Sequence, residues 1–159
     1  MKIDTNEILY RIKKALNLTT KDIIEAYRLE EYDMDASHLK NLLKRRKDKS
    51  MIKCSYEELG VFLDGLVSLK RGKSPKPKND TVVELTNNLI LKKLRVALEL
   101  KEAEIEIIFA LADIELTKQQ LSSLFRREDN KNFKLCSDEL LLSFLDGLDE
   151  FYFVGEIEE

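Results

Sequence analysis

Proline, glycine, cysteine and histidine are scarce in this chain, and tryptophan is absent. The 159 residues include two prolines, five glycines, two cysteines, one histidine and no tryptophan. So little proline and glycine excludes fibrous and low-complexity chains. No apolar run approaches the roughly 20 residues that span a bilayer, and residues 1–5 do not resemble the start of a signal peptide. We therefore expect a soluble cytoplasmic protein with no membrane partner.

Charged residues are abundant but unevenly distributed. They make up 36% of the chain, beside 43% hydrophobic residues, which is enough apolar material for a folded core. The formal net charge of -3 argues against strong steering toward nucleic acid. Residues 40–49 carry +5, residues 67–85 carry +3 and residues 149–159 carry -5. Such runs are most often solvated faces, so they mark places to examine for a partner.

The sequence repeats itself. A shift of 82 residues aligns residues 6–66 with residues 88–148 without a gap, and 21 of the 61 aligned positions are identical. The identities include Asn6 with Asn88, Cys54 with Cys136, and the segment FLDGL at 62–66 and 144–148. The chain therefore contains two copies of one unit.

The segment between the copies contains both prolines, Pro75 and Pro77, which disfavour helix. We predict a first helical repeat over residues 1–69, a basic proline-containing linker over 70–85, a second helical repeat over 86–149 and an acidic tail over 150–159. A helical unit of about 60 residues has a small core and marginal stability by itself. We therefore expect the two units to pack together.

Four helices are predicted in each unit. In the first helix, apolar residues recur at the spacing of one helix face, at positions 8, 9, 12, 15 and 16 and again at 90, 91, 94, 97 and 98. The second helix is expected to end near Glu30 and Asp113, and the fourth to continue through Leu69 in the first unit. No segment alternates at period two, so we expect no sheet.

The third helix is predicted to be short and to begin at a capping residue in each unit. Asp35 occupies this position in the first unit. Thr117 occupies it in the second unit and forms a capping box with Gln120, three residues later.

The two cysteines lie directly before Ser55 and Ser137, which are suited to cap the fourth helix. Ser55 completes a capping box with Glu58. Each cysteine then has the spacing of a hydrophobic staple, so we interpret Cys54 and Cys136 as buried apolar side chains and predict no disulfide between them.

His38 lies in the predicted third helix beside Leu39. The sequence around it has no acid or serine constellation, so we interpret it as a solvent-exposed or hydrogen-bonded side chain. One histidine and two isolated cysteines are too few ligands for a metal site. We predict neither metal nor cofactor.

An Asp-Gly pair recurs in the fourth helix, as Asp64-Gly65 and Asp146-Gly147. The glycine either ends the helix or allows another helix to approach closely. The aspartates are either ion-paired surface acids or, if the units meet around a pseudo-twofold axis, two catalytic carboxylates. Because no phosphate-binding loop, nucleophile elbow or zinc-binding spacing is present, we predict no catalytic residues and no enzymatic activity.

The second and third helices have the length of a helix-turn-helix, although the turn lacks the expected small residue. A hairpin packed for stability is the more common alternative. In the first unit, basic residues continue from the third helix into the segment after it. The candidate contacts for a nucleic acid or another partner are Lys40, Lys44, Arg45, Arg46, Lys47, Lys49, Arg126 and Arg127.

Several motifs of the second unit resemble the YehS-like family of bacterial proteins of unknown function. These motifs are LILKKLRVALEL at 89–100, IFALAD at 108–113, LSSLFRR at 121–127, CSD at 136–138 and FLDGL at 144–148. The resemblance covers nearly the whole chain and includes KRGK at 70–73. The first unit departs from it in the second helix, where AYRLEE at 26–31 replaces the alanine-rich pattern. The resemblance implies a tandem duplication and brings no known activity, cofactor or catalytic residue.

The sequence thus predicts an all-α protein made of two tandem homologous four-helix units containing helix-turn-helix-like hairpins. We expect a non-catalytic bacterial protein that acts as a macromolecular interaction or regulatory module and binds a protein partner. The alternative is a nucleic-acid-binding protein that uses the third helix of the first unit and its basic end. The oligomeric state stays open.

Overall fold

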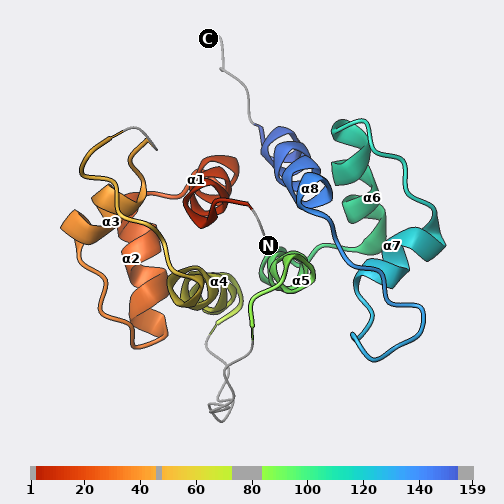
Figure 1. Cartoon of the computed structure of the whole chain (residues 1–159), viewed down its shortest axis with the longest axis horizontal. Coiled ribbons are helices and arrows are strands. Elements are labelled where there is room, and N and C mark those ends of the chain that lie inside the picture. Colours follow the sequence, from red (N-terminus) through yellow and green to blue (C-terminus); the bar gives the residue numbers. More distant parts are fainter. Residues whose placement is uncertain (1–2, 46–47, 73–83, 154–159) are drawn as a thin grey trace.

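The computed structural model describes residues 3–45, 48–72 and 84–153. Over these ranges the chain forms eight helices and no strand, which confirms the all-α prediction (Figure 1). The first unit contains α1 (Thr5–Ala15), α2 (Thr20–Leu29), α3 (Ala36–Leu42) and α4 (Tyr56–Arg71). The second unit contains α5 (Asn87–Leu98), α6 (Glu102–Leu111), α7 (Lys118–Leu124) and α8 (Asp138–Phe151).

The predicted caps begin the predicted helices. Asp35 accepts a hydrogen bond from the backbone N–H of His38 at the start of α3. Thr117 and Gln120 form a reciprocal capping box at the start of α7, and Ser55 forms one with Glu58 at the start of α4. These side chains satisfy backbone N–H groups that the first helical turn leaves without partners.

The first two helices of each unit end in the same way. Each is followed by a residue in the left-handed conformation, namely Asn17 and Glu31 in the first unit and Glu99 and Asp113 in the second. These four residues form two repeat-equivalent pairs. The backbone hydrogen bonds around them are those of a Schellman motif, which turns the chain sharply out of the helix.

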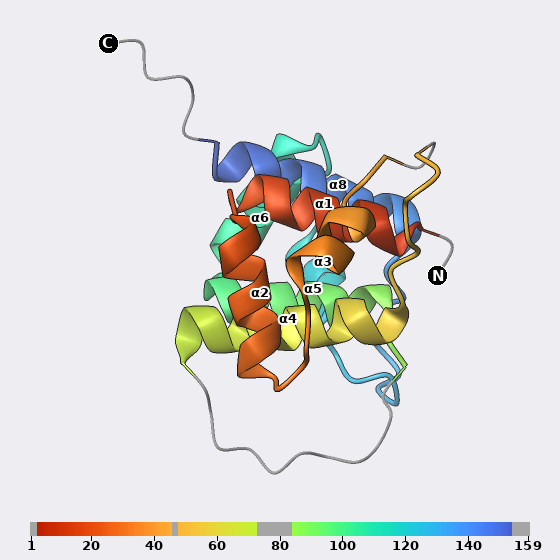
Figure 2. The ribbon, with the colours of Figure 1, turned by 90° about the vertical axis from the view of Figure 1, so that its left-hand side faces the viewer.

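The two units meet through their first and fourth helices. α1 packs on α8 and α4 packs on α5, so the four helices form one central layer across both units. Figures 1 and 2 show α2 and α3 on one side of this layer and α6 and α7 on the other. The units therefore pack together as predicted.

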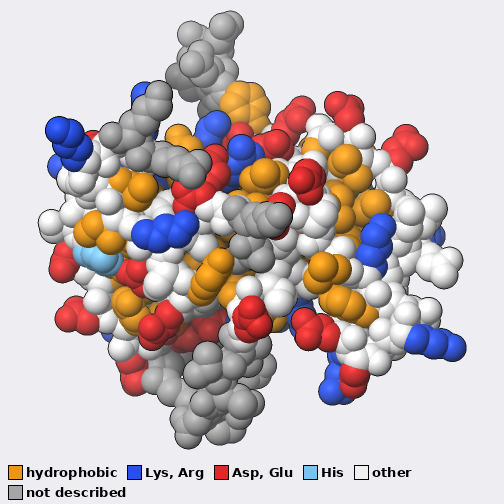
Figure 3. All heavy atoms as spheres, in the orientation of Figure 1, with side chains coloured by type: hydrophobic (Ala, Val, Ile, Leu, Met, Phe, Trp, Pro, Cys, Tyr) orange, Lys and Arg blue, Asp and Glu red, His pale blue; other side chains and the backbone are white. Residues whose placement is uncertain are grey.

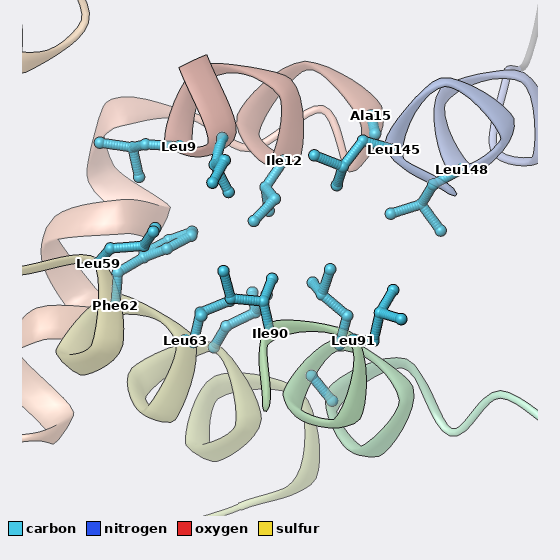
Figure 4. Close-up of a cluster of buried hydrophobic side chains, with 14 of the residues drawn as sticks. Leu9, Ile12, Ala15, Leu59, Phe62, Leu63, Ile90, Leu91, Leu145 and Leu148 are labelled. Carbon is cyan, nitrogen blue, oxygen red and sulfur yellow. The ribbon is translucent and has the colours of Figure 1, made fainter. Parts of the chain in front are cut away.

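Both units contribute to the core between them. Ile12 of α1 and Leu63 of α4 point toward Ile90 of α5 and Leu145 of α8 (Figure 4). These side chains are buried almost completely. Because full burial of a Leu or Ile side chain stabilises a fold by about 1.5–3 kcal/mol, each unit needs the other to gain this contribution.

The repeated glycines mark close helix contacts. α4 and α8 continue past Gly65 and Gly147, so neither glycine ends its helix. A Cβ at Gly65 would overlap the backbone carbonyl of Ala26 in α2, and one at Gly147 would overlap that of Ile108 in α6. The repeated glycines therefore allow another helix to approach closely, and they do not end their own helices.

The boundaries predicted at 69/70, 85/86 and 149/150 fall on described residues, and helices α4 and α8 extend past the first and the last of them. The linker predicted over 70–85 overlaps the last turn of α4, because no helix-breaking residue occurs before Gly72, where φ is 86°. Residues 73–83 of that linker and residues 154–159 of the predicted acidic tail lie outside the described ranges. Among the helices that are described, none has the length and apolar character required to cross a bilayer.

Candidate functional site

A buried asparagine anchors the segment after the third helix in each unit. In the first unit the Asn6 side chain donates to the backbone carbonyls of Leu42 and Ile52, at 2.8 and 2.7 Å. Its oxygen accepts from the backbone N–H of Cys54 at 2.8 Å. One side chain at the start of α1 therefore fixes the end of α3 and the loop that leads to α4.

The second unit repeats this arrangement. Asn88 donates to the carbonyls of Leu124 and Lys134 at 2.9 and 2.8 Å, and accepts from Cys136 N–H at 2.8 Å. The two asparagines were recognisable as a repeated identity, but their role was missed because their partners are backbone groups at least 36 residues away. They position the two loops that carry the candidate basic residues.

The third helices lie away from the interface between the units. Figure 1 places α3 and α7 at opposite ends of the long axis of the molecule. The candidate contacts therefore form two separate groups. Lys40, Lys44, Arg45 and Lys49 lie at one end, and Arg126 and Arg127 lie at the other; Arg46 and Lys47 are outside the described residues.

In the first unit, one residue of the basic group forms a hydrogen bond with a nearby side chain. Lys44 donates to the hydroxyl of Ser50, and Asp48 accepts from the backbone N–H of Ser50 at 2.9 Å. Lys40 is exposed on α3. Among the described residues, this end of the molecule therefore carries exposed bases, part of which are held by local hydrogen bonds.

In the second unit, Arg126 lines an open hollow of about 430 Å³ beside α7. Its other lining residues are polar or basic: Thr117, Gln119, Gln120, Ser123, Asn132 and Lys134. Arg127 lies 3.8 Å from Asp129. The hollow offers hydrogen-bond donors and positive charge, but the charged side chains around it are exposed.

The repeated aspartates serve the contact between the units. Asp64 of α4 is paired with Lys93 of α5, and Asp146 of α8 is paired with Arg11 of α1. Arg11 and Lys93 are themselves repeat-equivalent, so the two ion pairs are related by the duplication. Each carboxylate is held by a base of the other unit, which supports the ion-pair alternative over a catalytic carboxylate pair.

His38 has an acidic partner that its local sequence does not show. Its Nε2 lies 2.6 Å from Glu58 Oε2, and Glu58 is 7% exposed. Burial alone acts to raise the pKa of Glu58, but hydrogen bonds from Ser55 and His38 outweigh burial and hold that pKa below its ordinary value. The second unit replaces this pair with Gln120 and Leu140.

The cysteines are structural, as interpreted from the staple spacing. Cys54 and Cys136 are 1% and 2% exposed, and neither forms a disulfide. Burial raises the pKa of both thiols to about 12, so they stay protonated and weakly nucleophilic near neutral pH. Within the described part of the chain, no three His, Cys, Asp or Glu side chains are grouped as metal ligands.

The outer face of α6 is a further candidate surface, and none of the predicted basic residues lies on it. Opposite its buried residues, α6 exposes four apolar side chains, which we call the α6 strip: Ala103, Ile107, Ala110 and Leu111. Ile107 is 50% exposed and Leu111 is 37% exposed. Figure 3 shows hydrophobic side chains on the side of the molecule where Figure 1 places α6, with acidic side chains beside them.

The equivalent face of α2 is charged. Lys21, Glu25 and Arg28 occupy the positions of Ala103, Ile107 and Ala110. Glu25 and Arg28 form an ion pair on this face. A helix in contact with water on one side ordinarily has a polar outer face, as α2 has. The α6 strip departs from this rule, and the alanine-rich pattern at 108–113 was the sequence signal for it.

Comparison with known proteins identifies the relationship. A family model described as "Protein of unknown function (DUF1456)" matches residues 5–72 and 87–152. The chain belongs to this family. The two matched segments contain α1–α4 and α5–α8, so the match also confirms the tandem duplication.

A relative with a similar length confirms the YehS-like resemblance. "Uncharacterized protein YehS" of Escherichia coli (strain K12) is 30% identical over 145 residues, which cover 91% of this chain and 93% of the relative. No solved structure matches the chain. The family relationship thus establishes common ancestry, and neither the family description nor the relative's name specifies an activity.

Proposed function

We propose that this protein is a non-catalytic interaction module of the bacterial cytoplasm that binds a protein partner through the α6 strip. The observation that carries the proposal is the contrast between α6 and α2, which occupy equivalent places in the two units. Their buried faces are alike, whereas positions 103, 107 and 110 on the outer face of α6 are apolar and the equivalent positions 21, 25 and 28 of α2 are charged.

Exposure of an apolar face to water is unfavourable in free energy, and a partner that covers the face removes this cost. Covering apolar surface contributes about 25 cal/mol per Å² of surface removed from water. Contiguous exposed apolar patches are typical of protein interaction sites. The charged side chains of α2 show that the fold itself does not require apolar residues at positions 103, 107 and 110, so stability does not account for the apolar residues there; Leu111 has a leucine, Leu29, as its equivalent.

The experiment transfers the α2 face onto α6. The variant carries Ala103→Lys, Ile107→Glu and Ala110→Arg, which are the residues that the first unit has at the same positions. Because α2 already accommodates these side chains, we expect the variant to fold with little loss of stability, as circular dichroism and thermal unfolding would verify. We call this triple variant the face swap.

Tagged wild-type protein and the face swap are then compared by affinity capture from lysate of the source bacterium, followed by mass spectrometry. The proposal predicts a protein that the wild type captures and the face swap does not. Equal capture by both proteins, or no specific capture by either, would contradict it. A control with Lys40→Ala and Lys49→Ala should retain the partner.

The polar hollow beside α7 favours nucleic acid as a second candidate. Arg126 and Lys134 line it together with side-chain amides, a combination that suits phosphate and base edges. In a salt titration with duplex DNA and RNA, this candidate predicts binding at low ionic strength that weakens in Arg126→Ala. Absence of binding at low ionic strength would end it.

A further inference from the structure

The α6 strip lies between two acidic edges. At 100° per residue, Glu102 and Glu106 flank the strip on one side and Glu104 flanks it on the other. We call these three residues the acidic rim. Residues 101–115 contain one base and five acids: Lys101 against Glu102, Glu104, Glu106, Asp113 and Glu115. The surface around the strip is therefore negative on both sides.

The shape of the strip suits a helix. Ala103 and Ala110 lie two turns apart along α6, with Ile107 between them. Small side chains at this spacing let a second helix approach closely, and Ile107 then provides a knob that inserts between the side chains of that helix. A partner helix would need an apolar stripe of about three turns to cover the 10-residue α6.

The acidic rim determines the charge of the occupant. A helix seated on the strip brings the residues that border its own apolar stripe close to Glu102, Glu104 and Glu106. Lysine or arginine at these border positions is attracted to the three carboxylates, whereas aspartate or glutamate would be repelled by them. A second copy of α6 would place two acidic rims against each other, which disfavours self-association through this face.

We propose that the α6 strip binds an amphipathic helix of a partner protein whose apolar stripe is bordered by lysine or arginine. The inference rests on the proposed function and specifies its partner class. Apolar contact with Ile107 and Leu111 provides affinity, and the acidic rim selects basic over acidic helices.

The test uses the full chain and three synthetic peptides in place of the natural partner. The first is a 16-residue amphipathic helix with leucine on one face and lysine at its borders. The second has glutamate in place of every lysine, and the third has the composition of the first in an order that removes the helical period. Affinities are measured by fluorescence anisotropy at several salt concentrations.

We expect the basic amphipathic peptide to bind at least about tenfold more tightly than either other peptide, which corresponds to about 1.4 kcal/mol. Binding should weaken as salt rises, because part of the selectivity is electrostatic. Equal binding of the acidic peptide, or of the peptide without helical period, would overturn the inference.

Two variants separate the apolar and charged contributions. Ile107→Ser with Leu111→Ser leaves the net charge unchanged and should weaken the basic peptide about tenfold or more. Glu102→Gln with Glu106→Gln should reduce the preference for the basic peptide over the acidic one. Unchanged affinity and preference in these variants would contradict the proposed site.

The matched control is Glu57→Gln with Glu139→Gln. These repeat-equivalent glutamates are exposed near the starts of α4 and α8, and their replacement changes the net charge by the same amount as the rim variant. It should leave peptide binding unchanged. An equal effect of both double variants would mean that overall charge, and not the acidic rim, attracts the peptide, which overturns the inference.

Failure of this inference is distinguishable from failure of the proposed function. If the face swap loses a captured protein but the basic peptide does not bind, the interaction surface stands and its partner class is wrong. A wild-type dimer that the face swap dissociates, measured by analytical ultracentrifugation, would make a second copy the occupant and overturn the basic-helix inference.

Discussion

The two units of this protein share their interior and differ on their outer helices. Asn6 and Asn88 make the same three kinds of hydrogen bond, and Gly65 and Gly147 allow the same close helix contact. By contrast, α2 presents an ion-paired charged face where α6 presents the apolar α6 strip.

This contrast separates two kinds of constraint in one chain. At the repeated asparagines and glycines, a side chain or its absence determines how two backbones meet, and these positions are identical in the two units. Positions 21, 25 and 28 differ from their equivalents 103, 107 and 110 on the outer faces of α2 and α6, where the fold tolerates several residues. The duplication therefore provides an internal control: where the two units differ at equivalent positions, neither residue is required for the fold.

The largest effects are expected at the shared glycines. Gly65→Ala and Gly147→Ala should each destabilise the protein by about 3 kcal/mol, because the added Cβ forces two helices apart. Urea unfolding would measure this loss for both variants. Gly60→Ala in the same α4 is the control, since no atom lies within 4 Å of the added Cβ. A loss at Gly65 as small as at Gly60 would contradict close approach.

The asparagines should follow with a loss of about 2 kcal/mol each in Asn6→Ala and Asn88→Ala, since buried backbone groups lose their hydrogen-bond partners. Thermal or urea unfolding provides the measurement. Asn132→Ala, at an exposed loop position, should change stability by less than about 0.5 kcal/mol. A large loss at only one of the two asparagines would break the equivalence of the units.

The His38–Glu58 pair predicts an acid-sensitive contribution in the first unit alone. Because the pKa of Glu58 lies below its ordinary value of 4.5, its stabilisation is present above that value and is lost as pH falls through the lowered pKa. Between about pH 6 and about pH 3, wild type should lose about 1 kcal/mol more stability than Glu58→Gln.

Urea unfolding at several pH values measures this difference. The second unit has Leu140 at the position of Glu58 and cannot contribute in the same way. Glu139→Gln, at an exposed neighbouring position, should keep the acid response of the wild type. Identical pH dependence in wild type and Glu58→Gln would show that the pair contributes nothing.

The ion pairs between the units should have the smallest effect. A double-mutant cycle on Arg11 and Asp146 should give a coupling of less than about 1 kcal/mol that falls as salt rises. The Asp146 side chain is 64% exposed, so solvent screens this pair strongly. The equivalent cycle on Lys93 and Asp64 should agree, and a coupling several times larger in either would contradict a mainly apolar interface.

Features that depend on local spacing could be predicted from the sequence. The helices follow from apolar periodicity, and the caps at Asp35, Ser55 and Thr117 follow from short motifs with a local mechanism. The duplication follows from identities at one fixed shift. In each case the residues that determine the structure are only a few positions apart, or align without a gap.

Features that depend on distant partners could not be predicted in this way. Glu58 is 20 residues from His38, and the carbonyls that Asn6 binds are more distant still. A glycine within a helical pattern does not reveal which helix approaches it. The apolar character of residues 108–113 was evident, but the outer face of α6 becomes defined only once its buried face is known.

We propose the α6 strip, and not the equivalent face of α2, as the binding surface. The most direct test is a titration of the ¹⁵N-labelled full chain with the basic amphipathic peptide, followed by amide chemical shifts. The account predicts that the shifted amides cluster in α6, over residues 102–111, while those of α2, over 20–29, stay in place. Equal shifts in both helices, or shifts confined to the segments that contain Lys40 and Arg126, would contradict it.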